Sequence, residues 1–348
     1  MRPPLPASIA LGLAALLTLP STHADERMQV LASFSILADM VENIGGEHVA
    51  VTALVGPDSD AHVYSPRPTD ARALAEADLV VFNGLQFEGW MERLIDASDY
   101  AGPLVTTTDG IRQLDYHGQD DHDAHGHDDH DDHGHDDHGH DDHGHDDHDH
   151  DDHDHGDLDP HGWQDLNAGK VYVANIRDGL IQADPGNADA YSANAERFLD
   201  EIAATDAEIR ALIDEIPSST SVITGHDSFG HFAHAYGLRF LAPQGLSTEA
   251  DPSAADMAAL IEVIREQEVR ALFHENMTSP ALLEQLAEET GLPIAGTLYA
   301  DALASEGEAS TWLGMLRHNA NTLHDALAEP DNHDAADMGD SGDHGHEH

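Results

Sequence analysis

Apolar residues along the chain fall into short runs that alternate with longer stretches of helical spacing. Residues 28–33 form an apolar run typical of a buried strand, and residues 36–43 follow as a helix that Gly45-Gly46 ends. The same alternation predicts strands at 49–55, 79–82 and 104–106 and helices at 69–76 (capped by Thr69 or Asp70) and 90–95. Strands that alternate with helices predict a mostly parallel sheet with helices on both faces.

A second alternating series follows a long helical stretch. Residues 187–216 contain neither Pro nor Gly and keep a helical apolar stripe until Pro217, which predicts a helix about 45 Å long. Such a helix exceeds the width of one small domain, so we expect it to bridge two. The flanking pattern predicts helices at 166–181, 228–236, 253–266, 280–290 and 308–327, and strands at 221–224, 238–241, 271–274 and 293–296.

The predicted fold class is therefore α/β, with two lobes, each a mostly parallel sheet flanked by helices, joined by one long helix. We expect an N-terminal lobe at 25–186, the linking helix at 187–216 and a C-terminal lobe at 217–328. A cleft between two such lobes is a usual place for a ligand.

The N-terminus has the pattern of an export signal. Arg2 provides the positive charge, residues 9–19 are apolar, and Thr22-His23-Ala24 ends in a small residue suited to cleavage. We expect residues 1–24 to be a cleavable signal peptide, because the apolar run is too short to span a bilayer. The chain contains no cysteine for a lipid anchor, which favours a soluble periplasmic protein without a membrane anchor.

Composition adds a strong preference for cations. The 348 residues include 14 Lys and Arg against 68 Asp and Glu, a formal charge of −54, which argues against nucleic acid and anionic membranes as partners.

Of the 29 His, 15 lie in residues 115–159 together with 20 Asp. This tract, and a smaller tail at 329–348, cannot bury enough apolar surface to fold, so we expect disordered loops. A solvated acidic linker is the alternative, but so many imidazoles favour metal binding.

Four loops beside strand or helix ends carry candidate metal ligands. His62 follows the strand at 49–55, His161 follows the His/Asp tract, His226 ends the strand at 221–224, and Asp301 follows the strand at 293–296. Taken singly, each has an ordinary interpretation: an exposed turn, a helix entry capped by Asp165, a strand-to-helix turn and a solvated acid. The carboxyl ends of parallel strands face the cleft in such folds, which would bring these loops together.

Four polar residues near these candidate ligands are not predicted to bind the metal. Asp227 can orient His226 or cap the following helix, and the spacing of His231 and His234 predicts surface positions. Glu275 lies at a strand end and can approach the cleft, but a structural role is the simpler interpretation. His274-Glu275 begins like a zinc-protease motif but lacks the second His.

Three neutral imidazoles and one carboxylate would form a tetrahedral site suited to zinc, while imidazole also suits copper, iron and nickel. A manganese or magnesium site would normally hold more oxygen ligands. Four protein ligands leave no open position for an activated water, which favours binding over hydrolysis.

The ordered motifs GPDSDAHVYSP, DPHGW, GHDSFGHFA and LYADALAS, with a His-rich tract before DPHGW, resemble the zinc-binding solute-binding proteins of ABC importers. The resemblance covers about residues 27–328 and implies two α/β lobes with the metal between them. Carried over to this chain, the family's ligands are His62, His161, His226 and Asp301. Manganese-binding relatives usually have a carboxylate at the third position, so His226 favours zinc.

The expected function is therefore capture of Zn²⁺ in the periplasm and its delivery to an inner-membrane ABC permease, by a monomer that is not an enzyme. The His-rich loop would gather or buffer zinc beside the site, since its last histidine, His155, closely precedes His161. Three alternatives stay open: the same role for manganese, iron, nickel or copper, a secreted zinc hydrolase, and a metal-storage protein in which the tract is the whole function.

Overall fold

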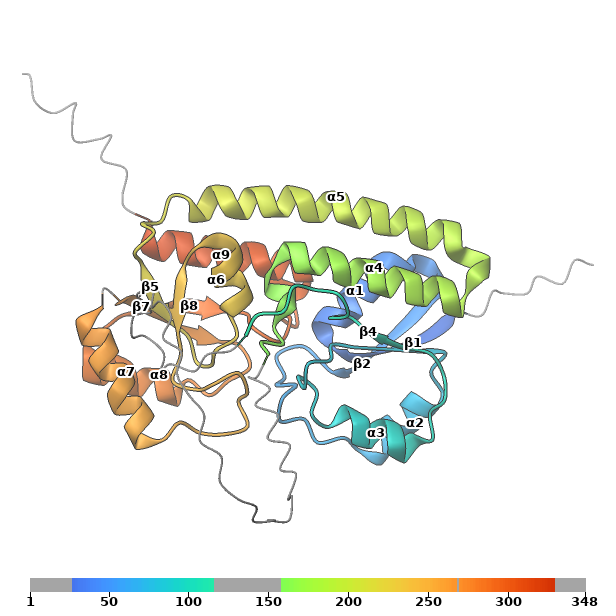
Figure 1. Cartoon of the computed structure of the whole chain (residues 1–348), viewed down its shortest axis with the longest axis horizontal. Helices are drawn as coiled ribbons and strands as arrows, with labels where there is room; N and C mark the ends of the chain where they lie inside the picture. Colours follow the sequence, from blue (N-terminus) through green and yellow to red (C-terminus); the bar gives the residue numbers. More distant parts are fainter. Residues whose placement is uncertain (1–26, 116–157, 268, 329–348) are drawn as a thin grey trace, which may run out of the picture.

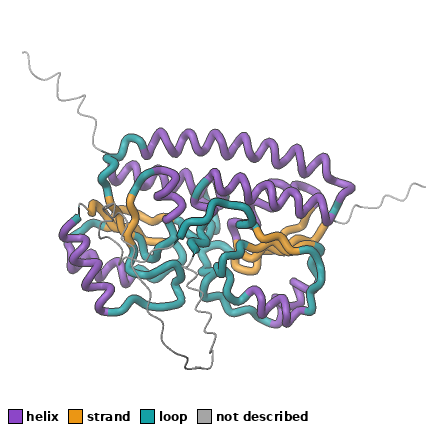
Figure 2. The backbone as a smooth tube through the Cα atoms, in the orientation of Figure 1, coloured by secondary structure: helices purple, strands orange, loops and turns teal. Residues whose placement is uncertain are grey.

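The computed structural model describes residues 27–115, 158–267 and 269–328. The predicted signal peptide, nearly all of the His/Asp tract and the C-terminal tail lie outside the described residues. Figure 2 shows the strands in two separate groups, with loops gathered between them.

The first lobe is built on a parallel sheet in the order β2-β1-β3-β4. Buried apolar side chains fill β1, and α1 turns its apolar face inward before Gly46, whose φ of 55° suits a residue without a side chain. The strands are β1 (Met28–Phe34), β2 (Val49–Val55), β3 (Leu79–Phe82) and β4 (Leu104–Thr106), and the helices are α1 (Ser35–Gly45), α2 (Pro68–Ala75), α3 (Met91–Ser98) and α4 (Leu166–Ala183).

The second lobe repeats this topology with the parallel order β6-β5-β7-β8. Its strands are β5 (Ser221–Ile223), β6 (Arg239–Leu241), β7 (Val269–Glu275) and β8 (Ile294–Leu298), and its helices are α6 (Gly230–Tyr236), α7 (Ala254–Glu266), α8 (Ala281–Thr290) and α9 (Trp312–Leu327). In both sheets the chain adds its second strand on one side of the first strand and its third on the other. Such a switch point opens a crevice at the carboxyl ends of the strands.

The long helix α5 (Ala188–Ile213) runs across both lobes (Figure 1). Its 26 residues span about 39 Å. It packs against α1 and α4 of the first lobe and against α9 of the second. Tyr191, Ala195, Phe198 and Ile202 are buried, as the apolar stripe predicts. The predicted fold of two parallel-sheet lobes with a long connecting helix is thus confirmed.

One hydrophobic core extends from the first sheet through α5 and α9 into one face of the second sheet. Trp312 at the start of α9 lies directly against Gly169 of α4, where any side chain would clash with the indole. Its ring nitrogen donates to the carbonyl of Trp163 at 3.0 Å. A smaller cluster lies between the second sheet and α7 and α8. The lobes therefore share apolar packing along the α5 side.

Most predicted helix starts shift by one or two residues, and that of α9 shifts from 308 to Trp312, because residues Glu308–Ser310 form a separate 3₁₀ turn. Helix α2 begins at Pro68, one residue earlier than expected, and Asp70 takes part in its cap by accepting the amide of Arg67, the residue before the helix, at 2.6 Å. Helix α6 begins only at Gly230, so Asp227 does not cap it. Among the described residues, no helix combines the length and apolar character that crossing a membrane requires.

Candidate metal centre

His62 lies in the loop that follows β2, and three contacts fix it there. Asp60 Oδ1 accepts the His62 amide at 2.9 Å, and Trp90 Nε1 donates to the carbonyl of Ala61 at 2.8 Å. The edge of the imidazole packs on Phe87, with ring centroids 4.6 Å apart. Only 4% of the His62 side chain is exposed, so the backbone and an aromatic neighbour set its position.

His161 precedes a single 3₁₀ turn (Gly162–Gln164) and is held by a carboxylate two residues earlier. Asp159 Oδ1 accepts the His161 amide at 2.9 Å and lies 2.7 Å from its Nδ1. Asn83 Nδ2 donates to the carbonyl of Pro160 at 2.9 Å. A carboxylate at Nδ1 leaves the lone pair of Nε2 for a metal. Asp165 then caps α4 by accepting the amide of Asn167 at 2.8 Å, as expected.

His226 follows β5 and is held by Glu275, the last residue of β7. Glu275 Oε2 lies 2.7 Å from His226 Nδ1, and Glu275 Oε1 accepts the amides of Gly225 and His226 at 3.1 and 3.2 Å. The contact follows from the topology, because β7 lies between β5 and β8. The expectation that Asp227 can orient His226 is wrong, since the partner of Nδ1 is Glu275.

Asp301 follows β8, and the first lobe fixes the residue before it. Trp163 Nε1 and Gln164 Nε2 both donate to the carbonyl of Ala300, at 2.9 and 2.8 Å. The Asp301 side chain is fully buried. The segment that carries His161 therefore also positions Asp301 across the boundary between the lobes.

The four residues converge on one point. One ligand atom from each of His62, His161, His226 and Asp301 lies within 4.8 Å of all the others, an arrangement that can hold a metal ion. Asp301 Oδ2 lies 3.2 Å from His62 Nε2 and 3.0 Å from His226 Nε2, and Oδ1 lies 3.7 Å from His161 Nε2.

These atoms are also unsatisfied. Within the described ranges, the Nε2 atoms of the three histidines and both Asp301 oxygens are buried without a hydrogen-bond partner of suitable geometry. Buried polar atoms are nearly always paired, so a set of orphans that face one another indicates a missing cation. The donor set thus fits a metal ion on the chemistry of its own residues.

The electrostatics favour a positive charge at this point. Burial alone would raise the pKa of Asp301, but the His226 and His161 imidazoles hold it well below its usual range. Burial likewise lowers the pKa of His226, yet the charges of Glu275 and Asp301 outweigh burial and raise it well above the usual value. The raised pKa favours a protonated His226 in the metal-free protein, and a bound metal ion would displace that proton.

One expectation for a nearby residue is wrong. His231 is buried, not at the surface, and its Nε2 lies 3.2 Å from the carbonyl of Asp159, because α6 packs against the segment that carries His161. His234 is exposed, as expected. Glu275 does approach the cleft, where it contacts a candidate ligand.

The ends of the predicted disordered tract are ordered. Asp115 pairs with Leu158 in an isolated antiparallel bridge, and Asp159 is buried against His161. A recurring pattern in the sequence points to Asp159: Asp60 and Asp159 each lie two residues before a candidate ligand and accept its amide at 2.9 Å. Sequence reasoning missed this pattern. The rest of the tract lies outside the described residues.

Known proteins share this sequence and fold. Residues 30–326 match the family described as ZnuA, zinc-uptake complex component A, periplasmic. The manganese-binding lipoprotein MntA of Bacillus subtilis is 31% identical over 311 residues, covering 87% of this chain and 91% of the relative. The metal ABC transporter substrate-binding lipoprotein SsaB of Streptococcus sanguinis is 26% identical over 315 residues, covering 87% and 90%.

Among solved structures, the periplasmic zinc-binding protein TroA of Treponema pallidum superposes with a TM-score of 0.74 at 24% identity, covering 87% of this chain and 100% of that one. This likeness supports the two-lobed fold. The family match extends over nearly all described residues and includes all four residues of the site. The chain therefore belongs to the ZnuA family of metal-binding proteins of uptake complexes.

Proposed function

We propose that this chain captures Zn²⁺ in the periplasm and delivers it to an inner-membrane ABC permease. The observation that carries the proposal is the convergence of three buried imidazole nitrogens and two carboxylate oxygens, all without partners, between the two lobes. A site closed by side chains from both lobes suits capture and release, because the ion is sequestered while bound. The substrate-binding role of SsaB in a metal ABC transporter supports the delivery step.

The donor chemistry supports zinc over manganese. Imidazole nitrogen is a good ligand for zinc, whereas manganese prefers carboxylate, carbonyl and water oxygens. His62, His161 and His226 offer three nitrogens against the single carboxylate of Asp301. MntA is named for manganese and the family for zinc uptake, so relatives alone leave the metal open.

The same geometry supports binding rather than catalysis. Four protein ligands would complete a tetrahedral zinc site and leave no position for an activated water. The carboxylates of Asp159 and Glu275 are each engaged with a ligand imidazole, so neither is placed as a general base for such a water. The secreted zinc hydrolase is the weaker alternative for this reason.

The proposal also covers where the chain is located and what the His/Asp tract at residues 115–159 does. We infer that the chain is released into the periplasm as a monomer by cleavage after residue 24, where the export-signal pattern ends. The chain also has no cysteine to carry the lipid of a lipoprotein such as MntA. The 15 His of residues 115–159 would gather or buffer zinc at low affinity, since unorganised ligands bind weakly. Asp115 and Leu158 hold the two ends of this tract beside Asp159, close to the cleft site.

Anomalous diffraction from zinc-loaded crystals, measured on both sides of the zinc absorption edge, tests the proposal. We expect one strong peak between the lobes, with His62, His161, His226 and Asp301 at about 2.0–2.2 Å from it. Competition titration of the full chain with zinc and manganese should show zinc preferred at this site. A peak elsewhere, or a water completing the coordination in place of one of the four, would overturn the assignment.

A further inference from the structure

The loop that carries His62 is attached to the second lobe at two aspartates. Asp58 donates its amide to the carbonyl of Leu303 at 2.9 Å, and its carboxylate accepts Asn276 Nδ2 and the Ser305 amide, both at 3.1 Å. Two of these bonds connect one end of the loop to the segment that follows Asp301, and the third connects it to Asn276, the residue after β7. The second attachment, two residues later, differs because it also touches a candidate ligand.

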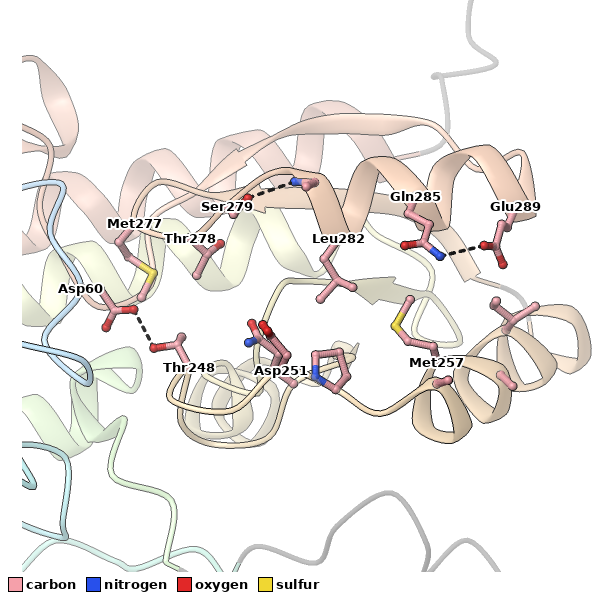
Figure 3. A pocket seen from close by; sticks show the side chains of 16 residues that line it. Asp60, Thr248, Asp251, Met257, Met277, Thr278, Ser279, Leu282, Gln285 and Glu289 are labelled. Atoms are coloured by element: carbon pink, nitrogen blue, oxygen red, sulfur yellow. Dashed lines mark hydrogen bonds between the residues drawn. The ribbon is translucent and has the colours of Figure 1, made fainter.

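The two oxygens of Asp60 bind to different lobes. Oδ1 accepts the amide of His62 at 2.9 Å, and Oδ2 accepts the hydroxyl of Thr248 at 2.6 Å (Figure 3). Thr248 belongs to the second lobe, so one carboxylate connects the position of a ligand to the position of the opposite lobe. A hydroxyl bonded to a carboxylate is among the stronger hydrogen bonds in proteins.

Thr248 lies in residues 242–253, a segment without helix or strand between β6 and α7. Its other end contacts the His226 loop, where Gln244 forms an isolated bridge with His226 and Gly245 accepts the amide of Asp227 at 3.1 Å. The segment thus touches the loops of two candidate ligands, one from each lobe. Because this segment has no helix or strand of its own and contacts both lobes, it is placed to shift when the lobes separate.

Asp60, Gln244 and Thr248 also line a cavity of about 760 Å³ that extends along α7 and α8 (Figure 3). Of the four site side chains, His62 alone has exposed surface, 4%, while those of His161, His226 and Asp301 have none. His62 is thus the one site side chain with exposed surface, and Asp60, two residues before it, lines this cavity.

We propose that Asp60 and Thr248 form a clasp that holds the metal site closed on the His62 side, so that the ion leaves only after this contact breaks. The proposal rests on the proposed function, because it assigns the clasp to the retention of the captured ion. Asp60 is a positioning residue in this account and does not itself bind the metal. Its carboxylate holds the His62 amide within the loop through Oδ1 and connects the loop to the second lobe through Oδ2.

Release of zinc from the full chain tests the clasp. Thr248→Val keeps the shape of the side chain and removes only the hydroxyl. After rapid mixing of the zinc-loaded protein with excess EDTA, we expect zinc to dissociate about tenfold faster, equivalent to about 1.4 kcal/mol. Tryptophan fluorescence distinguishes the cleft site from the tract, because Trp163 lies 5.3 Å from His161 between ring centroids and residues 116–157 contain no tryptophan.

Two control variants show whether the effect on zinc release comes from the Thr248 hydroxyl itself. Thr248→Ser restores the hydroxyl and should return the dissociation rate to that of the wild type. Ser247→Ala removes a neighbouring hydroxyl that accepts only the amide of Glu249 within the same segment, and should leave the rate unchanged. In a double-mutant cycle, Asp60→Ala should accelerate release less in the Thr248→Val background than in the wild type, since the two residues share one contact.

The possible outcomes distinguish a failure of the clasp proposal from a failure of the proposed zinc capture. Wild-type release rates for Thr248→Val, equal acceleration by Ser247→Ala, or additive effects of Asp60→Ala and Thr248→Val would each overturn the clasp while leaving zinc capture intact. If the wild-type chain itself shows no zinc-dependent change in fluorescence and no tight binding, the proposed function fails instead. Unchanged circular dichroism of the metal-free variants would show that the faster release is not a loss of fold.

Discussion

Glu275 Oε2 lies 2.7 Å from His226 Nδ1, and both side chains are fully buried. The same relationship recurs in the first lobe, where Asp159 Oδ1 lies 2.7 Å from His161 Nδ1. Two of the three candidate imidazoles thus have a carboxylate behind them, and the third, His62, is held through its backbone by Asp60. A carboxylate behind a ligand imidazole fixes its tautomer and increases its basicity, which strengthens the bond to a metal.

Glu275→Gln should lower zinc affinity by about 10–100-fold, the range for loss of such a partner. The single amide oxygen can still accept from Nδ1–H, but the NH₂ group then faces the Gly225 and His226 amides that Oε1 accepts, so the negative charge and these two bonds are lost together. Unchanged circular dichroism of the metal-free variant would show that the fold persists. Competition titration against a chelator of known affinity measures the effect. Glu284→Gln, at an exposed position on α8, is the matched control and should bind zinc like the wild type. Wild-type affinity in Glu275→Gln would show that the pair is only structural.

Zinc binding at pH 7 should release about one proton from the site, because metal ligands must be deprotonated. The raised pKa of His226 keeps this imidazole protonated in the metal-free protein above its ordinary titration range near 6.5. In that protein the His226 contribution to stability is complete below the unfolded pKa and is lost as pH rises through the folded pKa.

Isothermal titration calorimetry in buffers of different ionisation enthalpy counts the protons released with the first equivalent of zinc. Glu275→Gln should release fewer protons, because Glu275 is the largest of the charges that raise the His226 pKa. Binding of zinc without proton release at pH 7 would contradict the charge state assigned to His226.

Deletion of residues 117–155 should leave one tight zinc site and remove the weak ones. Asp115 and Leu158 already pair with each other, so rejoining the chain between them requires only a short turn. Zinc should still bind with better than about micromolar affinity, which corresponds to about 8 kcal/mol. Loss of all binding would mean that the tract is the whole function, as in a storage protein. Equilibrium dialysis before and after the deletion distinguishes the two.

The fold follows from regular features of the sequence, whereas the set of four converging residues comes from the resemblance to a known family, since each residue alone has an ordinary interpretation. Alternating apolar runs locate the strands, and the carboxyl ends of parallel strands bring His226 and Asp301 to one edge. The partners of the ligands were harder to find. Glu275 is one residue at the end of a strand, and only the order β5-β7-β8 shows that it lies behind His226. The burial of His231 depends on how α6 packs against the His161 segment, which no local pattern encodes.

His226→Ala should weaken zinc binding at least 100-fold, about 2.7 kcal/mol. The substitution removes one of the two site residues that the second lobe supplies and leaves Glu275 buried without its partner. His231→Ala is the informative comparison, since this buried imidazole contacts the carbonyl of Asp159 but is not among the converging residues. It should lower the melting temperature while changing zinc affinity less than threefold, a change below about 0.7 kcal/mol. An equal loss of affinity in both variants would mean that the third ligand is assigned wrongly.

His226→Glu tests why the site would prefer zinc. The variant exchanges an imidazole nitrogen for a carboxylate, so that Asp301 and the new side chain offer oxygen ligands beside His62 and His161. Manganese favours oxygen ligands, and preference should therefore shift from zinc towards manganese. The buried Glu275 would then face a second carboxylate instead of an imidazole, which costs affinity for both metals. Glu275→Gln in the same chain removes that repulsion, so the double variant should regain affinity while keeping the shifted preference. Competition titrations with both metals measure the ratio of affinities, and an unchanged ratio in both variants would show that the third ligand does not set the metal.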